Sequence, residues 1–308
     1  MTRPILHHYD LSPFAEKVRL AFGHKQVAWD SVEVPIWPPR PDMVPLTGGY
    51  RRIPALQIGA DIYCDTALIL SELDRRYPDR ALYPAGQVGA VTAFAAWADA
   101  AGFVPAATLT TSIIGDNVPA EFIADRIAFM KHDFSLAASR KAAPVNRQRV
   151  TALIGILADM LSDGRPFLFG DTLSAADLAA YHPLWFARGN GGEAIARLIP
   201  LDALAPWMDR IAAIGHGERT TMTAADALAM ARHASPDPVE GVAGDDPGGL
   251  VAGDAVLVQA DQANDPVRGI LVAANAREIV VRHDSDAAGT VHVHLPRLGY
   301  AVVREGDV

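Results

Sequence analysis

Residues 51–78, RRIPALQIGADIYCDTALILSELDRRYP, decide the fold of the first part of the chain. The runs ALQI and IYC, separated by a Gly-Ala-Asp turn, are typical of a β-hairpin. The helical pattern that follows begins after Asp65 and must end near Pro78, because a residue before proline avoids the helical conformation. The segment therefore predicts a strand pair and a helix, with Ile53-Pro54 directly in front of the hairpin.

Upstream of this segment, the sequence predicts a strand, a helix and a second strand. Residues 4–9 are β-like, and Ser12 followed by Pro13 predicts a helix start, since a hydroxyl N-cap and a proline at the first helical position are both favoured. Residues 27–34 alternate as a strand, and a proline-rich loop follows. The order β-α-β-loop-β-β-α is that of the thioredoxin-like fold. We therefore expect an α/β thioredoxin-like domain over residues 1–80.

The remaining chain divides into a helical part and a β part. From residue 85 to 234 the pattern is helical throughout, and Ser174 with Asp177 makes a capping-box-like start to a mostly apolar helix. We expect this helix at the centre of an all-α domain. A Pro/Gly/Asp-rich linker is predicted over residues 235–252, and five short strands over 253–308 predict a small β-barrel-like module of SH3-like or OB-like size.

We expect the β module to fold on its own core, because the composition changes sharply across the linker. The candidate ligand motifs all lie before Asp79, so a chain cut near Gly241 is expected to stay folded with an intact site. The alternative is that about 55–60 residues give only a marginal core, so that the module must dock on the helical domain and truncation exposes an apolar patch. His283, His292 and His294 lie in the module, and the last two share one strand face and could bind a metal. We interpret them as solvent-facing histidines and predict no metal.

Charge and composition exclude several classes of partner. The formal net charge is −9, and from Asp237 onward 12 acidic residues and five arginines leave −7. Such a module is a poor partner for phosphate backbones or anionic lipid, so we predict neither nucleic-acid nor membrane binding.

The apolar stretch 86–115, with Asp99 as its one charge, is interpreted as a buried helix pair. The start of the chain has no apolar signal-peptide core, and Cys64, the one cysteine, is interpreted as a packed thiol. We expect a cytoplasmic protein.

Three element starts in the first domain are candidate ligand sites. If Ile53-Pro54 is cis, the backbone of Ile53 is left unpaired and can pair with a peptide-like ligand; otherwise Pro54 is an ordinary turn proline. Asp65 and Thr66 open a helix whose N-terminus attracts a carboxylate, and Asp65 could meet an amino group; the alternative is a helix cap alone. Ser12 is either only a helix N-cap or a hydroxyl that lies beside the thiol of a bound ligand and favours its thiolate form.

Together these elements resemble the N-terminal domain of glutathione transferases. The segments that carry the resemblance are SPFAEKVRL, RRIPAL and CDTALILSELDRRYP, in this order and spacing. FLFGDTLSAADLAAYHPLWF resembles the capping-box segment of the helical domain of that superfamily. The resemblance covers roughly residues 4–230. It implies glutathione as a co-substrate, and we expect a homodimer.

The resemblance also implies ligand contacts. Ile53, held by Pro54, would pair with the cysteinyl backbone of glutathione. Asp65 and Thr66 would take the γ-glutamyl group, and Arg52 would reach the glycyl carboxylate.

Two residues are candidates for activating the glutathione thiol. The resemblance implies Ser12, as in the Ser/Cys-type classes, and Tyr9 is a rival because other classes use a tyrosine from the first strand. Related classes place cysteine where Ser12 stands, and redox members carry CxxC; here the pattern is Ser12-x-x-Ala15, which excludes exchange through a mixed disulfide. Phe14 and Trp37 are candidate walls of an apolar substrate pocket, with core packing as the alternative for Phe14.

Two classes of function remain open. The first is an enzyme that joins glutathione to a small hydrophobic electrophile, or uses glutathione to cleave or isomerise it. The second is a non-enzymatic glutathione-fold protein whose β module recruits a partner. Ser12, Asp65 and Thr66 favour the enzyme, whereas the additional module favours the scaffold.

Overall fold

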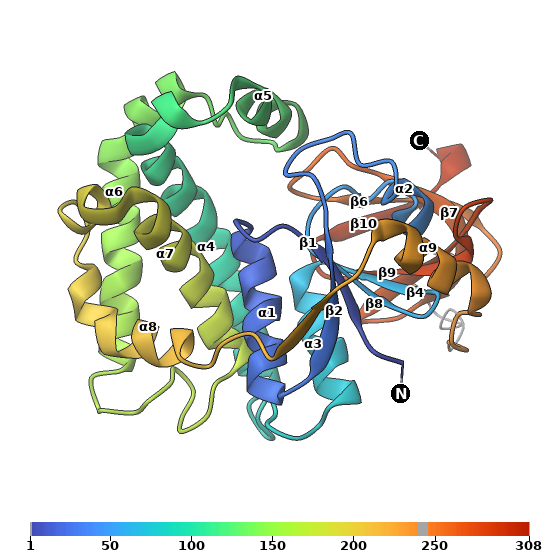
Figure 1. Ribbon diagram of the computed structural model, residues 1–308, viewed down its shortest axis with the longest axis horizontal. Helices are drawn as coiled ribbons and strands as arrows, with labels where there is room; N and C mark the ends of the chain where they lie inside the picture. The colour runs from blue at the N-terminus through green and yellow to red at the C-terminus, as the bar shows by residue number, and fades with distance from the viewer. Residues whose placement is uncertain (1, 240–245, 308) are drawn as a thin grey trace.

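The elements expected in the first 80 residues are present in the expected order (Figure 1). This computed structural model describes residues 2–239 and 246–307, so that 240–245, a part of the predicted linker that includes Gly241, lies outside it. The elements are β1 (Ile5–His8), α1 (Pro13–Lys25), β2 (Ala28–Glu33), α2 (Val44–Thr47), β3 (Ala55–Ile58), β4 (Asp61–Cys64) and α3 (Thr66–Arg76).

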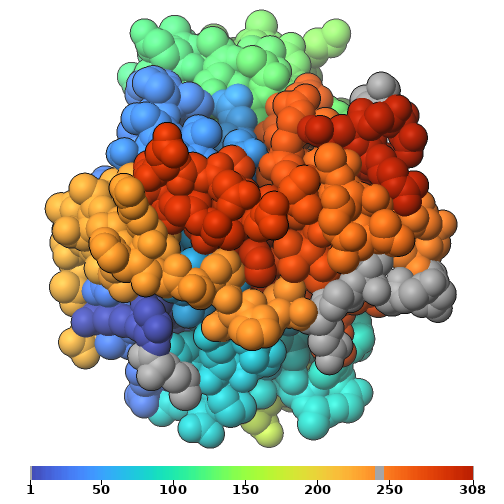
Figure 2. Space-filling view, turned by 90° about the vertical axis from the view of Figure 1, so that its right-hand side faces the viewer, coloured from blue at the N-terminus to red at the C-terminus, as the bar shows by residue number. Residues whose placement is uncertain are grey.

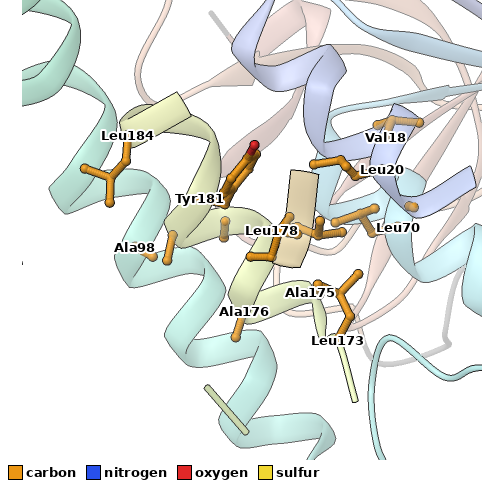
Figure 3. Packing of buried hydrophobic residues seen from close by; sticks show 14 of the residues in the cluster. Val18, Leu20, Leu70, Ala98, Leu173, Ala175, Ala176, Leu178, Tyr181 and Leu184 are labelled. Atoms are coloured by element: carbon orange, nitrogen blue, oxygen red, sulfur yellow. The ribbon is translucent and has the colours of Figure 1, made fainter. Parts of the chain in front are cut away.

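The helical domain lies beside this α/β part and shares an apolar core with it (Figure 1). The predicted capping box begins α7, because the N–H of Ser174 donates a hydrogen bond to the carboxylate of Asp177 (3.0 Å). The same carboxylate also accepts hydrogen bonds from the N–H of Leu168 (2.8 Å) and the indole of Trp207 (3.0 Å). Figure 3 shows α7 between α4 on one side and α1 and α3 on the other, so the helix expected at a domain centre is found there. The elements are α4 (Val88–Ile114), η1 (Gly115–Asn117), α5 (Ala120–Phe129), α6 (Leu136–Met160), α7 (Ala175–Ala196), η2 (Leu201–Leu204) and α8 (Ala205–Ala212).

The apolar stretch 86–115 contains one long helix, α4 (Val88–Ile114), rather than the expected helix pair. By length and composition the segment Val88–Asn117 is apolar enough to cross a membrane, and 22% of its most apolar window is buried. In the fold α4 packs on α6 and α7, and Asp99, near its middle, forms an ion pair with Lys17 of α1 (2.7 Å). Trp97 on the outer side of the helix is 39% exposed. The helix is thus a packed element of the domain with one apolar outer side.

The chain returns from the helices to the sheet earlier than expected. We predicted helix up to residue 234, but β5 (Glu218–Thr221) pairs parallel to β2, and α9 (Ala224–His233) packs into the core around the sheet. Gly217 permits the return, since its φ is +70° and a Cβ there would lie 2.7 Å from the carbonyl oxygen of Val27. The helical domain therefore ends with α8, and the boundary at 234 is corrected.

All five strands predicted for the C-terminal module are present. Within residues 2–239 and 246–307 they belong to one ten-stranded sheet in the order β10-β6-β7-β8-β9-β4-β3-β1-β2-β5. The described parts of the predicted linker, 235–239 and 246–252, contain neither helix nor strand. The strands are β6 (Ala255–Ala260), β7 (Val267–Ala274), β8 (Glu278–Ser285), β9 (Gly289–Pro296) and β10 (Tyr300–Arg304), followed by η3 (Glu305–Asp307).

The module is not independent of the first domain, which corrects our expectation. β9 runs parallel to β4, with Asp61 opposite His292 and Tyr63 opposite His294. Apolar residues of both parts form a single buried cluster, in which Ile62 and Val293 are fully buried. The physical reason is that β4 would otherwise be an edge strand with unpaired backbone groups.

The five strands curl back toward the domain that they extend, so the module is barrel-like in curvature. Tyr300 begins β10, the outermost strand of the order, and yet its hydroxyl contacts Asp65 directly after β4 (3.0 Å). Figure 2 shows the face that these orange and red segments occupy, between residues of α5 above and residues near α3 below. The module therefore reaches the region in which the sequence places the ligand site.

Candidate functional site

Strand register brings the predicted ligand residues to one end of the sheet. Ala55 of β3 pairs with both His7 of β1 and Cys64 of β4. Ile53 lies just before Ala55, Asp65 just after Cys64, and the turn that leads to α1 just after β1. Three segments that are separated in sequence thus meet around one point.

The bend before β3 has the predicted geometry. The peptide bond between Ile53 and Pro54 is cis. Among the described residues, no backbone hydrogen bond outside the helices and strands involves the N–H or C=O of Ile53. Both groups can therefore pair with an extended, peptide-like ligand. Ile53 also borders a cavity of about 160 Å³, whose other lining residues are Pro38, Arg40, Met43, Val44, Gly49, Tyr50 and Arg51.

The start of α3 combines a helix cap with an unusual backbone. Asp65 caps the helix, because its Oδ1 accepts a hydrogen bond from the N–H of Ala67 (3.0 Å). Its φ of +74° is rare for a residue with a side chain, and such conformations persist where the surroundings impose them, often at ligand sites. Its second oxygen, Oδ2, accepts a hydrogen bond from the hydroxyl of Tyr300 (3.0 Å). The carboxylate is therefore held on two sides.

A buried ionic network lies directly behind Thr66, at the interface of the two domains. The ammonium group of Lys17 donates hydrogen bonds to Thr66 Oγ1 (2.9 Å) and to Asp99 Oδ2 (2.7 Å). Asp99 also accepts a hydrogen bond from His182 Nε2 (2.8 Å). The ring of His182 lies 4.7 Å from that of Phe14, which in turn lies 4.6 Å from Phe103. Phe14 thus packs in the domain interface.

The protonation states in this network follow from burial and charge. Burial lowers the pKa of His182 to about 4, against the smaller opposing effect of Asp99. Burial would raise the pKa of Asp99, but Lys17 and His182 together hold it below its ordinary value. Near neutral pH the network therefore contains a lysine–aspartate ion pair and a neutral histidine. It fixes the start of α3 relative to α1 and α4.

Ser12 is a buried helix cap, with 1% of its surface exposed. Its Oγ accepts a hydrogen bond from the N–H of Ala15 (3.2 Å), and among the described residues no protein group accepts its own proton. The hydroxyl can therefore still donate. The rival Tyr9 is directed toward α5, where Arg126 donates a hydrogen bond to its hydroxyl (3.3 Å). The ring of Trp37 packs nearby against Phe122 of α5, at 6.4 Å between centroids.

Residues of the β module engage Arg52, the residue next to Ile53. Arg52 Nε lies 3.3 Å from Asp265 Oδ2, in the turn between β6 and β7, and its guanidinium lies 5.7 Å from the centre of the Tyr300 ring. The side chain of Asp265 is 1% exposed. Burial raises the pKa of Asp265 above its ordinary value, and Arg52 offsets this only in part. The module therefore contacts both charged residues of the predicted site, Arg52 and Asp65.

Comparison with known proteins decides the family. The N-terminal domain of glutathione S-transferases matches residues 6–81, and their C-terminal domain matches residues 124–210. A GST-like protein from Pseudomonas syringae is 37% identical, with a TM-score of 0.79, over 99% of this chain and 100% of its own. The chain belongs to the glutathione S-transferase family. The match to the P. syringae protein over nearly the whole chain includes the C-terminal β module.

More distant structures share the fold of this transferase-family chain. A glutathione S-transferase from Rhodospirillum rubrum F11 is 22% identical, with a TM-score of 0.52, over 68% of this chain and 87% of its own. A glutathione transferase family member from Pseudomonas fluorescens, with two glutathione bound, is 12% identical, with a TM-score of 0.51, over 68% of this chain and 87% of its own. No curated protein matches the chain.

Other residues singled out in the sequence have clear places in this family member. Cys64 is buried, and burial raises the pKa of its thiol well above the ordinary value, so it is a packed thiol. The expectation of solvent-facing histidines is wrong for His294, because the module packs on β4 and leaves it 3% exposed. Phe14 and Trp37 pack against different helices, and their role as pocket walls stays a prediction.

The sequence reasoning missed Lys17, Asp265 and Tyr300. Asp99 is the one charge of an apolar stretch. Because a buried charge requires a partner, this signal could have pointed to a cation such as Lys17. Asp265 lies in the turn between β6 and β7, and Tyr300 is the first residue of β10. No local sequence pattern marks either residue as a neighbour of the site.

Proposed function

We propose that this chain binds glutathione through Ile53, Asp65 and Thr66 and uses it on a small hydrophobic electrophile, with Ser12 as the activating residue. The observation that carries the proposal is the meeting of the cis bend, the start of α3 and the turn before α1 at one end of the sheet. The glutathione-bound P. fluorescens protein, which shares the fold, adds support.

Each part of glutathione has a chemical counterpart at this site. The backbone of Ile53 suits the cysteinyl peptide group, since it offers one donor and one acceptor. The carboxylate of Asp65 suits the γ-glutamyl ammonium, and the N-terminus of α3 at Thr66 suits the γ-glutamyl carboxylate. Arg52 suits the glycyl carboxylate.

Ser12 is the better candidate for thiol activation because of its position and its free proton. It lies at the N-terminus of the 13-residue helix α1, whose dipole favours a negative charge there. A hydroxyl that donates to sulfur stabilises the thiolate, which is the nucleophile. Tyr9 instead has its hydroxyl engaged by Arg126.

We further propose that the β module, in the arrangement described, competes with glutathione for its two charged contacts. Asp265 neutralises Arg52, and the hydroxyl of Tyr300 uses one oxygen of Asp65. A ligand with a carboxylate at one end and an ammonium at the other must displace or share both interactions. The module therefore sets the affinity of the site.

The substitution Asp65→Asn tests the binding site, because asparagine keeps a cap acceptor and tolerates positive φ while it removes the charge. Loss of a charge-assisted contact costs about 1.5–3 kcal/mol, so we expect glutathione affinity to fall about 10- to 150-fold in calorimetry. An analogue without the γ-glutamyl ammonium serves as the matched control, and its affinity should be the same for both proteins. Unchanged glutathione affinity would refute the assignment.

Ser12→Ala tests the activator through the titration of bound glutathione, followed by thiolate absorbance in the ultraviolet. Loss of a hydrogen bond to a charged group should raise the thiol pKa by about one to two units. Ser12→Thr, which keeps the hydroxyl, should restore the lower pKa. A rise in Tyr9→Phe, with none in Ser12→Ala, would transfer the role to Tyr9.

Asp265→Asn and Tyr300→Phe test the competition by the module. Each substitution frees one charged contact, and we expect each to tighten glutathione binding about five-fold, equivalent to about 1 kcal/mol. Glu305→Gln is the control, since Glu305 pairs with Arg268 in an exposed ion pair (3.4 Å) away from these contacts and should change nothing. Weaker binding in the first two variants would mean that the module builds the site instead.

The scaffold hypothesis remains as the second candidate, since the additional module is a part that an enzyme of this fold does not need. The two are distinguished by a screen of model electrophiles with the full chain. Glutathione binding without thiolate formation or turnover favours the scaffold. The expected homodimer and the expected cytoplasmic location stay proposals. For the dimer contact we propose the apolar outer side of α4, where Trp97 is exposed.

A further inference from the structure

Three side chains with metal-binding atoms converge where the module joins the first domain. Asp61 of β4 lies opposite His292 of β9 in the parallel pairing, and His294 follows two residues later on the same strand face. The distance from Asp61 Oδ1 is 3.0 Å to His294 Nε2 and 3.9 Å to His292 Nδ1. The three ligand atoms all lie within 4.8 Å of one another.

These separations suit one small cation. Two histidine nitrogens and one carboxylate oxygen are a ligand set that zinc and similar divalent ions accept. Bonds of about 2.0–2.1 Å in a tetrahedral site place neighbouring ligand atoms about 3.3 Å apart. The observed distances of 3.0 and 3.9 Å fall on either side of that value. Small side-chain shifts would therefore bring the atoms to bonding distance.

The surroundings hold two of the ligands in position. The Nδ1–H group of His294 donates a hydrogen bond to Glu278 Oε2 (3.1 Å), which directs its Nε2 toward Asp61. Metal-bound histidines commonly have such a carboxylate partner. The second oxygen of Asp61 accepts a hydrogen bond from the N–H of Asp237 (2.8 Å), and the ring of Tyr63 stacks on His294 at 4.3 Å.

His292 supplies the independent sign of a missing ligand. Its Nδ1 is buried and has no hydrogen-bond partner among the described residues. An unpaired buried polar atom is destabilising unless something binds it. The side chain of His292 as a whole is 14% exposed, so the cluster lies close to the protein surface.

We propose that Asp61, His292 and His294 bind a divalent transition-metal ion of the zinc type at the seam between β4 and β9. Because the ligands come from both parts of the chain, the ion ties the module to the first domain. The site does not depend on the proposed glutathione chemistry, because none of its three ligands is a proposed glutathione contact. It replaces our sequence-based prediction that the module binds no metal.

The test uses the full chain after treatment with a chelator, with Zn²⁺ alone as the probe. Calorimetry should show one ion bound per chain, and the melting temperature should rise with Zn²⁺ concentration, as for any ligand of the folded state. Co²⁺ in its place should give the visible absorbance of a tetrahedral site.

His292→Ala is the decisive variant, because His292 Nδ1 has no hydrogen-bond partner among the described residues. Without metal, the variant loses only packing contacts of this ring, so its metal-free melting temperature should fall only slightly. Loss of an outer partner of a metal ligand alone costs 10- to 100-fold in affinity, so loss of a ligand should cost more than about 100-fold. His283→Ala on the neighbouring strand β8 is the matched control and should bind Zn²⁺ like the parent. No Zn²⁺ uptake by the parent, or equal uptake by His292→Ala, would overturn the site and leave an Asp61–His294–Glu278 ion network.

Discussion

The parallel pairing of β9 with β4 is the interaction on which the arrangement of the C-terminal half of the sheet and the surroundings of the site depend. It fixes the direction of β9, so that its C-terminal end lies beside the end of β4, where Asp65 begins the ligand site. The chain then turns into β10 and brings Tyr300 to Asp65. Reversal or a shift of this one pairing would remove the module from the site.

The same pairing explains why the module has no separate core. A five-stranded segment of about 55 residues buries little apolar surface alone and is marginal in stability. Packed on β4 and under α9, its valines and isoleucines join residues such as Ile62 in one cluster. The module gains stability in this way, and the first domain gains a covered edge strand.

A second constraint acts at the other side of the site. Lys17, Asp99 and His182 are largely removed from water, and burial of charges is unfavourable unless they are paired. The pairing requires α1, α4 and α7 to keep fixed positions, and Thr66 takes part in it. The start of α3 therefore lies between two fixed neighbours, the domain interface behind it and the β module beside it.

Local features of this fold were predictable from the sequence, and long-range pairings were not. The five strands predicted over 253–308 are found there, and Ser12, Pro54 and Asp65 have the predicted local geometry, because each of these features depends on a few neighbouring residues. The parallel pairing of Asp61 with His292 joins residues more than 200 positions apart, and no periodicity marks the partner of a parallel strand. For the same reason the contacts of Tyr300 and Asp265 with the site were missed.

The most direct test of this account is amide hydrogen exchange of the full chain, measured strand by strand through a denaturant series. The tryptophans all lie outside the module, at positions 29, 37, 97, 185 and 207, so their fluorescence reports the unfolding of the rest of the chain. If the sheet is one unit, amides of β6–β9 should lose protection together with those of β1, β3 and β4, at the denaturant concentration of the fluorescence transition. Loss of protection in β6–β9 at a lower concentration, while β1, β3 and β4 stay protected, would contradict the account and describe a separable module.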